Sequence, residues 1–101
     1  MTTPIERLTD TQVREALTTL PGWALKGGLE ISRQYTFRDF VEAMRFVNRV
    51  AELAEAADHH PDITIRYTRV VLVLATHSAG GLTEKDVALA RQIDATAQGG
   101  G

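Results

Sequence analysis

The most constraining feature of the sequence is a long segment, residues 36–58, whose apolar side chains follow helical spacing along two faces. One apolar stripe comprises Phe37, Phe40, Val41, Met44, Val47, Ala51 and Ala54, and the other comprises Ala43, Phe46, Val50, Leu53 and Ala57. A helix that is apolar on two sides is usually buried on two sides. In a chain of 101 residues, we expect one cover from a sheet and the other from a second subunit or a short first helix.

The ends of this helix are predicted from the residues around it. Thr36 is expected to cap its first turn, with Asp39 at the third position. The helix is expected to run to Asp58 or His59 and to end before Pro61, because the residue before a proline disfavours the helical conformation.

A short helix and a β-hairpin are predicted before this segment. Residues 9–12 fit the capping-box pattern, and apolar side chains then repeat at helical spacing up to Pro21-Gly22. Residues 23–26 and 29–35 are expected to form strands. Gly27-Gly28 would form the turn between them, because glycine adopts positive φ without steric cost.

A second hairpin and a last helix are predicted after Pro61. Residues 62–68 alternate between apolar and polar, which indicates a strand with one wet face, and Tyr67 is expected on its buried side. Residues 70–76 are apolar and rich in β-branched side chains, which indicates a more buried strand, with Thr68-Arg69 as the turn. Thr83 is expected to begin the last helix, whose inward face comprises Val87, Ala90, Ile93 and Ala97.

The predicted order of elements is helix, strand, strand, helix, strand, strand, helix. Strands that form hairpins and pack on helices indicate an α+β fold, here with a four-stranded antiparallel sheet and the helices on one face. Residues 1–97 are expected to form a single domain, and residues 98–101 a flexible glycine-rich tail.

Composition argues against several classes of function. The net charge of −2, with both signs interleaved, provides no basic face for nucleic-acid binding. Without cysteine there is no disulfide, thiolate zinc site or thiol nucleophile. The longest apolar run, residues 70–75, is far shorter than the roughly 20 residues that cross a bilayer. Because the N-terminus also lacks a signal pattern, a cytoplasmic protein without membrane contact is expected.

Three histidines are the candidates for proton-transfer chemistry, because imidazole both gives and accepts protons near neutral pH. His59 and His60 lie where the long helix ends, and His77 ends the apolar strand. Sites are commonly built where elements end. Two such ends at one edge of a small sheet could bring the three rings together.

The same residues also have structural interpretations. Asp86, the third residue after Thr83, could complete a helix N-terminus. Glu55 lies one turn before His59 and could make a surface contact with it, and Asp58 could be a solvated charge.

The sequence argues against other kinds of site. A zinc site is the rival use of three histidines. However, adjacent residues rarely point at one metal, and no H-x-x-x-H or cysteine spacing is present, so no metal is expected. Phosphate-loop, dinucleotide and serine-hydrolase motifs are absent from the sequence.

Taken together, the spacing resembles the signature of the pterin-4a-carbinolamine dehydratases. The matching residues are Glu55, Asp58, His59, His60 and Pro61, followed at the family's spacing by Tyr67, His77 and Asp86. An early segment is also similar to that family and comprises Leu8, Thr9, Leu17, Leu20, Gly22 and Trp23. The resemblance covers most of residues 8–97.

The resemblance implies a hydro-lyase that needs no metal or organic cofactor. It would eliminate water from 4a-hydroxytetrahydrobiopterin to give quinonoid dihydrobiopterin, and so recycle the pterin of aromatic amino-acid hydroxylases. His59 and His77 would be the acid–base pair, and His60 would chiefly hold the pterin. Asp58, Thr76 and Ser78 would contact the substrate, and either Glu55 or Asp86 would orient an imidazole.

Two departures from the family pattern affect the expected pocket. Ser78 stands where some relatives have an acidic residue, and Ile63 stands where a number of them have an aromatic side chain. Both changes could alter affinity for the pterin while the three histidines remain.

The resemblance also implies a homodimer or homotetramer and leaves two other functions open. One is a non-enzymatic dimerisation or assembly cofactor on the same fold, and the other is a pterin-binding protein with a different substrate. The complete set of three histidines favours the enzyme, because an assembly factor has no need of it.

Overall fold

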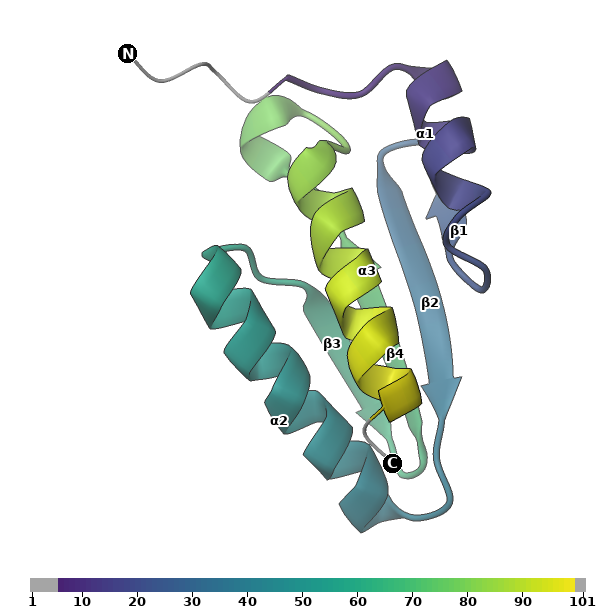
Figure 1. Ribbon diagram of the computed structural model, residues 1–101, viewed down its shortest axis with the longest axis vertical. Helices are drawn as coiled ribbons and strands as arrows, with labels where there is room; N and C mark the ends of the chain where they lie inside the picture. The colour runs from purple at the N-terminus through teal and green to yellow at the C-terminus, as the bar shows by residue number, and fades with distance from the viewer. Residues whose placement is uncertain (1–5, 100–101) are drawn as a thin grey trace.

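Two β-hairpins and three helices make up the chain in the computed structural model, which describes residues 6–99 (Figure 1). The elements are α1 (Asp10–Leu17), β1 (Ala24–Lys26), β2 (Glu30–Thr36), α2 (Phe40–Ala57), β3 (Asp62–Arg66), β4 (Arg69–Leu74), the 3₁₀ turn η1 (His77–Ala79) and α3 (Glu84–Gly99). This order confirms the predicted α+β fold. None of the described helices is long and apolar enough to cross a membrane.

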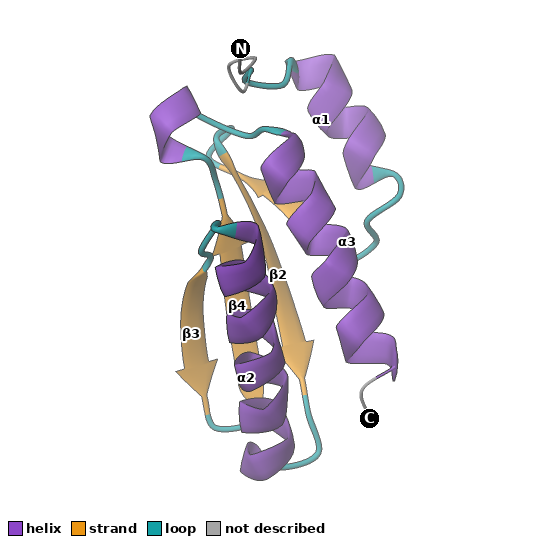
Figure 2. Ribbon diagram, turned by 60° about the vertical axis from the view of Figure 1, so that its left-hand side comes forward, coloured by secondary structure: helices purple, strands orange, loops and turns teal. Residues whose placement is uncertain are grey.

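The sheet is antiparallel throughout, with strand order β1-β2-β4-β3. The three helices lie over one of its faces (Figure 2). Buried side chains of the central strands face them, because Ile31 of β2 pairs with Leu74 of β4, and Tyr35 pairs with Val70. The other face carries mostly polar and charged side chains, with Val71 and Val73 of β4 among them, as an antiparallel sheet with one wet face allows. β4 therefore alternates between buried and partly exposed residues and is not buried throughout.

The prediction that Thr36 caps the long helix is wrong. Thr36 still belongs to β2, where it pairs with Arg69, and α2 begins three residues later than a Thr36 cap requires. Asp39 is the cap, because its carboxylate accepts a hydrogen bond from the N–H of Glu42 at 2.8 Å. At the other end, the left-handed conformation of Asp58 (φ 49°) terminates the helix before Pro61 is reached.

The two apolar stripes of α2 merge into one buried face, whose members are Ala43, Phe46, Val47, Val50 and Ala54. This face meets the sheet and α3, which lies beside α2 (Figure 1). The cover from within the chain thus comes from the last helix and not from α1. Phe40 and Val41, in the first turn of α2, remain 47% and 59% exposed. That a second subunit covers α2 therefore stays a prediction, and Phe40 and Val41 are the surface that it would cover.

The expectation that Tyr67 belongs to the core is also wrong. Tyr67 is 71% exposed and adopts a left-handed conformation (φ 56°) in the turn between β3 and β4. β3 ends at Arg66, and β4 already begins at Arg69, so the turn is Tyr67-Thr68. A residue in the turn leaves the alternation of the strand, which is why the period-two pattern fails at this position.

α3 extends further than predicted. Its backbone continues to Gly99, so positions 98 and 99 of the expected tail are helical. Gly100 and Gly101, and residues 1–5 of the expected domain, lie outside the described residues.

A polar cluster that sequence reasoning missed joins α3 to the first hairpin. Asp94 accepts hydrogen bonds from the indole N–H of Trp23 and from the Arg33 guanidinium, each at 3.0 Å, and from the Tyr35 hydroxyl. The same guanidinium donates to the carbonyl of Pro21 at 2.7 Å. Burial, together with the hydrogen bond and negative charge of Asp94, raises the pKa of Tyr35 above its ordinary value of 10.0.

This pKa shift predicts a loss of stability in alkali. Above about pH 10 an unfolded tyrosine releases its proton while the folded Tyr35 keeps it, so the free energy of unfolding falls as the pH rises. Between about pH 8 and pH 11, urea titrations should show a loss of about 1 kcal/mol that is missing in Tyr35→Phe. Equal losses in both proteins would contradict this assignment.

Candidate functional site

The centre of the candidate site is Asp86, which is fully buried in the first turn of α3. One carboxylate oxygen, Oδ1, lies 2.6 Å from Nε2 of His59. The other, Oδ2, accepts hydrogen bonds from the Thr76 hydroxyl at 2.8 Å and from the N–H of Thr83 at 2.9 Å. Asp86 therefore has both of the roles that were predicted as alternatives: it caps α3 and it orients an imidazole. A buried carboxylate is tolerated when donors satisfy it in this way.

The turn at the end of α2 directs His59 inward. After the left-handed Asp58, the N–H of His59 donates back to the carbonyl of Ala54 at 3.0 Å, which fixes the backbone against the last helical turn. The residue is 9% exposed, and its neighbours Asp58 and His60 face solvent. Two adjacent histidines thus have opposite environments.

The partners of Asp86 determine the tautomer of His59. A carboxylate has only acceptor atoms, so Nε2 carries the proton in this contact, and a neutral ring then has a free lone pair on Nδ1. Among the described residues, Nδ1 has no hydrogen-bond partner, and it keeps contact with solvent. Carboxylates fix catalytic imidazoles in this manner.

A pair of hydroxyl groups supports the carboxylate from the opposite side. Thr76, at the end of β4, and Thr83, before α3, are buried, with their side-chain oxygens 2.8 Å apart. The backbone of Thr76 also pairs with Gly81. Thr76, proposed from the sequence as a substrate contact, therefore holds Asp86 with its hydroxyl. The sequence predicts Thr83 as the start of the last helix and Asp86 as a residue that completes its N-terminus, but it does not predict the contact between the two threonine hydroxyls.

His60 lies on the surface with a different carboxylate. Its Nε2 is 2.5 Å from Oε2 of Glu55, and both side chains are more than half exposed. The one-turn spacing of Glu55 and His59 predicted a contact between these two residues. In the structure Glu55 contacts His60 instead. An exposed pair of this kind contributes little to stability.

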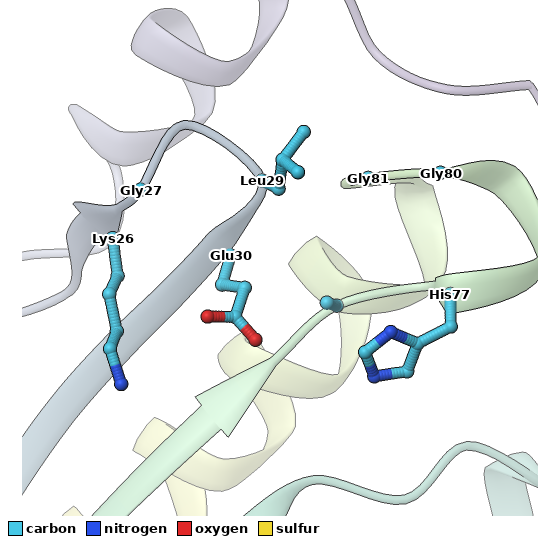
Figure 3. A pocket seen from close by; sticks show the side chains of 8 residues that line it. Lys26, Gly27, Leu29, Glu30, His77, Gly80 and Gly81 are labelled. Atoms are coloured by element: carbon cyan, nitrogen blue, oxygen red, sulfur yellow. The ribbon is translucent and has the colours of Figure 1, made fainter.

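His77 lines a pocket of about 250 Å³ at the end of β4 (Figure 3). The pocket is also bounded by Lys26, Gly27, Leu29 and Glu30 from the first hairpin. Ala75, Gly80 and Gly81 complete it. His59, His60 and Ser78 are not among its lining residues, so the convergence of the three imidazoles on one cleft stays a prediction.

The chain does connect these residues through Asp86. Because Asp86 contacts both His59 and Thr76, the loop after α2 lies against the end of β4, where His77 follows directly. Lys26 and Glu30 were not foreseen, because only the strand register brings them to this end of the sheet. Within residues 6–99, no group of three or more His, Cys, Asp or Glu side chains could hold a metal ion.

The buried contacts of Asp86 predict a large effect on stability. Both carboxylate oxygens of Asp86 face hydrogen-bond donors. In Asp86→Asn, one of these oxygens becomes an N–H₂ group, which is itself a donor and leaves buried donors unsatisfied. The free energy of unfolding should therefore fall by about 3 kcal/mol. Urea denaturation measures this loss. Glu84→Gln, which removes an exposed charge from the same helical turn, is the matched control, and equal effects of the two substitutions would contradict the assignment.

Comparison with known proteins identifies the family of this chain. The family model described as pterin 4 alpha carbinolamine dehydratase matches residues 6–96. A protein of Thermomicrobium roseum is 59% identical over 86% of this chain and 92% of its own length. One of Koribacter versatilis is 53% identical with the same coverage. Both carry the name "Putative pterin-4-alpha-carbinolamine dehydratase".

Two solved structures are similar to this chain. A protein of Brucella melitensis described as a transcriptional coactivator/pterin dehydratase has a TM-score of 0.86 and 43% identity, over 89% of this chain and 97% of that one. A pterin dehydratase-like protein described as a RuBisCO assembly factor has a TM-score of 0.63 and 25% identity, over 73% of this chain and 87% of that one. With a family match over nearly its whole length and relatives above half identity, the chain belongs to the pterin-4a-carbinolamine dehydratase family.

Proposed function

We propose that this chain is an active dehydratase that removes water from 4a-hydroxytetrahydrobiopterin and gives quinonoid dihydrobiopterin. The observation that carries the proposal is the buried Asp86–His59 pair, which leaves one imidazole nitrogen of fixed tautomer able to accept a proton. His77, on the wall of the neighbouring pocket, supplies a second imidazole. Membership of the family supports the choice of substrate.

The proposed reaction needs two proton transfers and no redox step. The C4a–O bond breaks, its electrons leave with the hydroxyl group, and a delivered proton converts that group into water. Loss of the N5 proton provides the electrons for the new C4a=N5 double bond. Each transfer by a positioned side chain contributes typically 10²- to 10⁴-fold to the rate.

The environments of the histidines suit different parts of this reaction. His59, held through Nε2, would accept the N5 proton on Nδ1, and His77 would protonate the leaving hydroxyl. His60, which is exposed and paired with Glu55, would hold the pterin ring. Asp58 and Ser78, both exposed beside these histidines, would add contacts to the substrate.

This mechanism predicts a loss of rate on removal of either imidazole. An aromatic amino-acid hydroxylase generates the 4a-carbinolamine, and absorbance follows the quinonoid product. His59→Ala and His77→Ala should each lower kcat/KM by about 100-fold or more, whereas Glu52→Ala, on the exposed side of α2, should leave it unchanged. Unchanged rates in both histidine variants would reject the assigned roles.

A non-enzymatic role on the same fold is the alternative, since the two similar structures are described as a transcriptional coactivator/pterin dehydratase and a RuBisCO assembly factor. The buried Asp86–His59 pair favours the enzyme, because a purely structural partner has no need of an imidazole with a fixed tautomer. A folded wild-type protein without dehydratase activity would favour the alternative.

We also propose that the chain works as a homodimer or homotetramer through α2. Phe40 and Val41 leave apolar surface exposed at the start of this helix, and association would bury it. Light scattering should give two or four times the monomer mass of 11.1 kDa, and Val41→Glu should lower that mass. A wild-type mass equal to the monomer would refute the proposal.

A further inference from the structure

The His77 pocket continues across the sheet to a wall that the proposed mechanism does not use. Lys26 and Glu30 are register partners in the first hairpin. The neighbouring ladder pairs Ile31 with Leu74, so its next step brings Glu30 alongside Ala75. Because alternate residues share a face, Lys26, Glu30 and Ala75 lie in that order in a row across the helix-free face. The small side chain of Ala75 leaves the surface low at the end of the row next to Glu30.

The ionisable groups around this space have no side-chain partners in the described part of the chain. Lys26, Glu30 and His77 form no side-chain hydrogen bond or ion pair with any of residues 6–99. Lys26 and Glu30 are not paired with each other, although they are register partners. Figure 3 shows Glu30 and His77 on either side of the end of β4, with the Glu30 carboxylate between the Lys26 and His77 side chains. Glu30 is a partly buried residue that borders the pocket, and its carboxylate has no donor among residues 6–99, so it is able to accept hydrogen bonds from a ligand.

We infer that Glu30 determines specificity by accepting hydrogen bonds from the 2-amino-4-oxopyrimidine edge of the substrate, an inference that rests on the proposed function. That edge presents two adjacent donors, the ring N3–H and the exocyclic 2-amino group. Two parallel N–H groups match the two oxygens of a carboxylate, the geometry that makes guanidinium–carboxylate pairs strong. A 2,4-dioxo heterocycle presents a carbonyl oxygen in place of the amino group and would be repelled.

This placement also orients the reacting atoms. With the pyrimidine edge at Glu30, the rest of the flat bicyclic ring lies over Ala75 and directs its C4a–N5 bond toward His77. One contact at the far wall thus selects the ring and fixes its direction. Glu30 is a positioning residue in this scheme, since it does not touch the atoms that react.

The test compares two ligands that differ only at this edge. Binding of 6-methylpterin and 6-methyllumazine is measured by fluorescence titration, with wild type, Glu30→Gln and the control Glu52→Gln. Wild type and the control should prefer the pterin. Glu30→Gln should weaken pterin binding by roughly 10- to 100-fold, because a charge-assisted pair is lost, and should leave lumazine binding nearly unchanged. Circular dichroism verifies that the variants are folded.

The outcomes separate this inference from the proposed function. Wild type that binds pterin, with a Glu30→Gln variant that keeps the same affinity and selectivity, would overturn the role of Glu30 and leave the dehydratase proposal standing. Equal weakening of both ligands in Glu30→Gln would overturn the role too, because the effect would not depend on the donor edge. Folded wild type that binds neither ligand would overturn both proposals.

Discussion

The buried carboxylate of Asp86 is the interaction on which the candidate site depends. It joins three segments that are distant in sequence: the loop after α2, through His59; the end of β4, through Thr76; and the start of α3, through Thr83. Each contact satisfies a group that would be costly to bury alone. The same contacts that hold the last helix on the sheet therefore orient an imidazole, and in this protein stability and site geometry have one physical origin.

The two faces of the sheet have different roles: one is packed into the core, and the other borders the His77 pocket. The helix-covered face contains the core, and the Asp94 cluster fixes α3 to the first hairpin at a distance from the histidines. No described helix covers the other face, and the His77 pocket opens at its end next to Glu30 and Lys26. Because α3 is held near its start by Asp86 and in its second half by Asp94, the sheet that forms the pocket wall belongs to a rigid framework, which suits the proposed positioning of a flat ring.

Local sequence patterns predicted the elements and their order, because hydrophobic periodicity and capping chemistry act within a few residues. They were wrong about burial at Tyr67, which lies in a turn. The alternation of the preceding strand does not reveal the left-handed conformation of this residue. They also misplaced the cap of α2, because Thr36 and Asp39 are both good caps and the pairing of Thr36 with Arg69 decides between them. Local sequence predicted Asp86 at a helix N-terminus, and the family resemblance implied that either Asp86 or Glu55 orients an imidazole. The position of Glu30 depends on the register of three strands, which no local pattern contains.

In the proposed mechanism, Asp86 holds His59 with the proton on Nε2 and leaves Nδ1 to accept a proton from the substrate. Long-range ¹H–¹⁵N NMR of the imidazoles reports the tautomer of each ring directly. We expect that neutral His59 is the Nε2–H tautomer, that a bound stable pterin shifts its Nδ1 resonance, and that the tautomer preference is lost in Asp86→Asn. A His59 ring protonated on Nδ1, or one whose tautomer does not respond to Asp86→Asn, would rule out this role of Asp86.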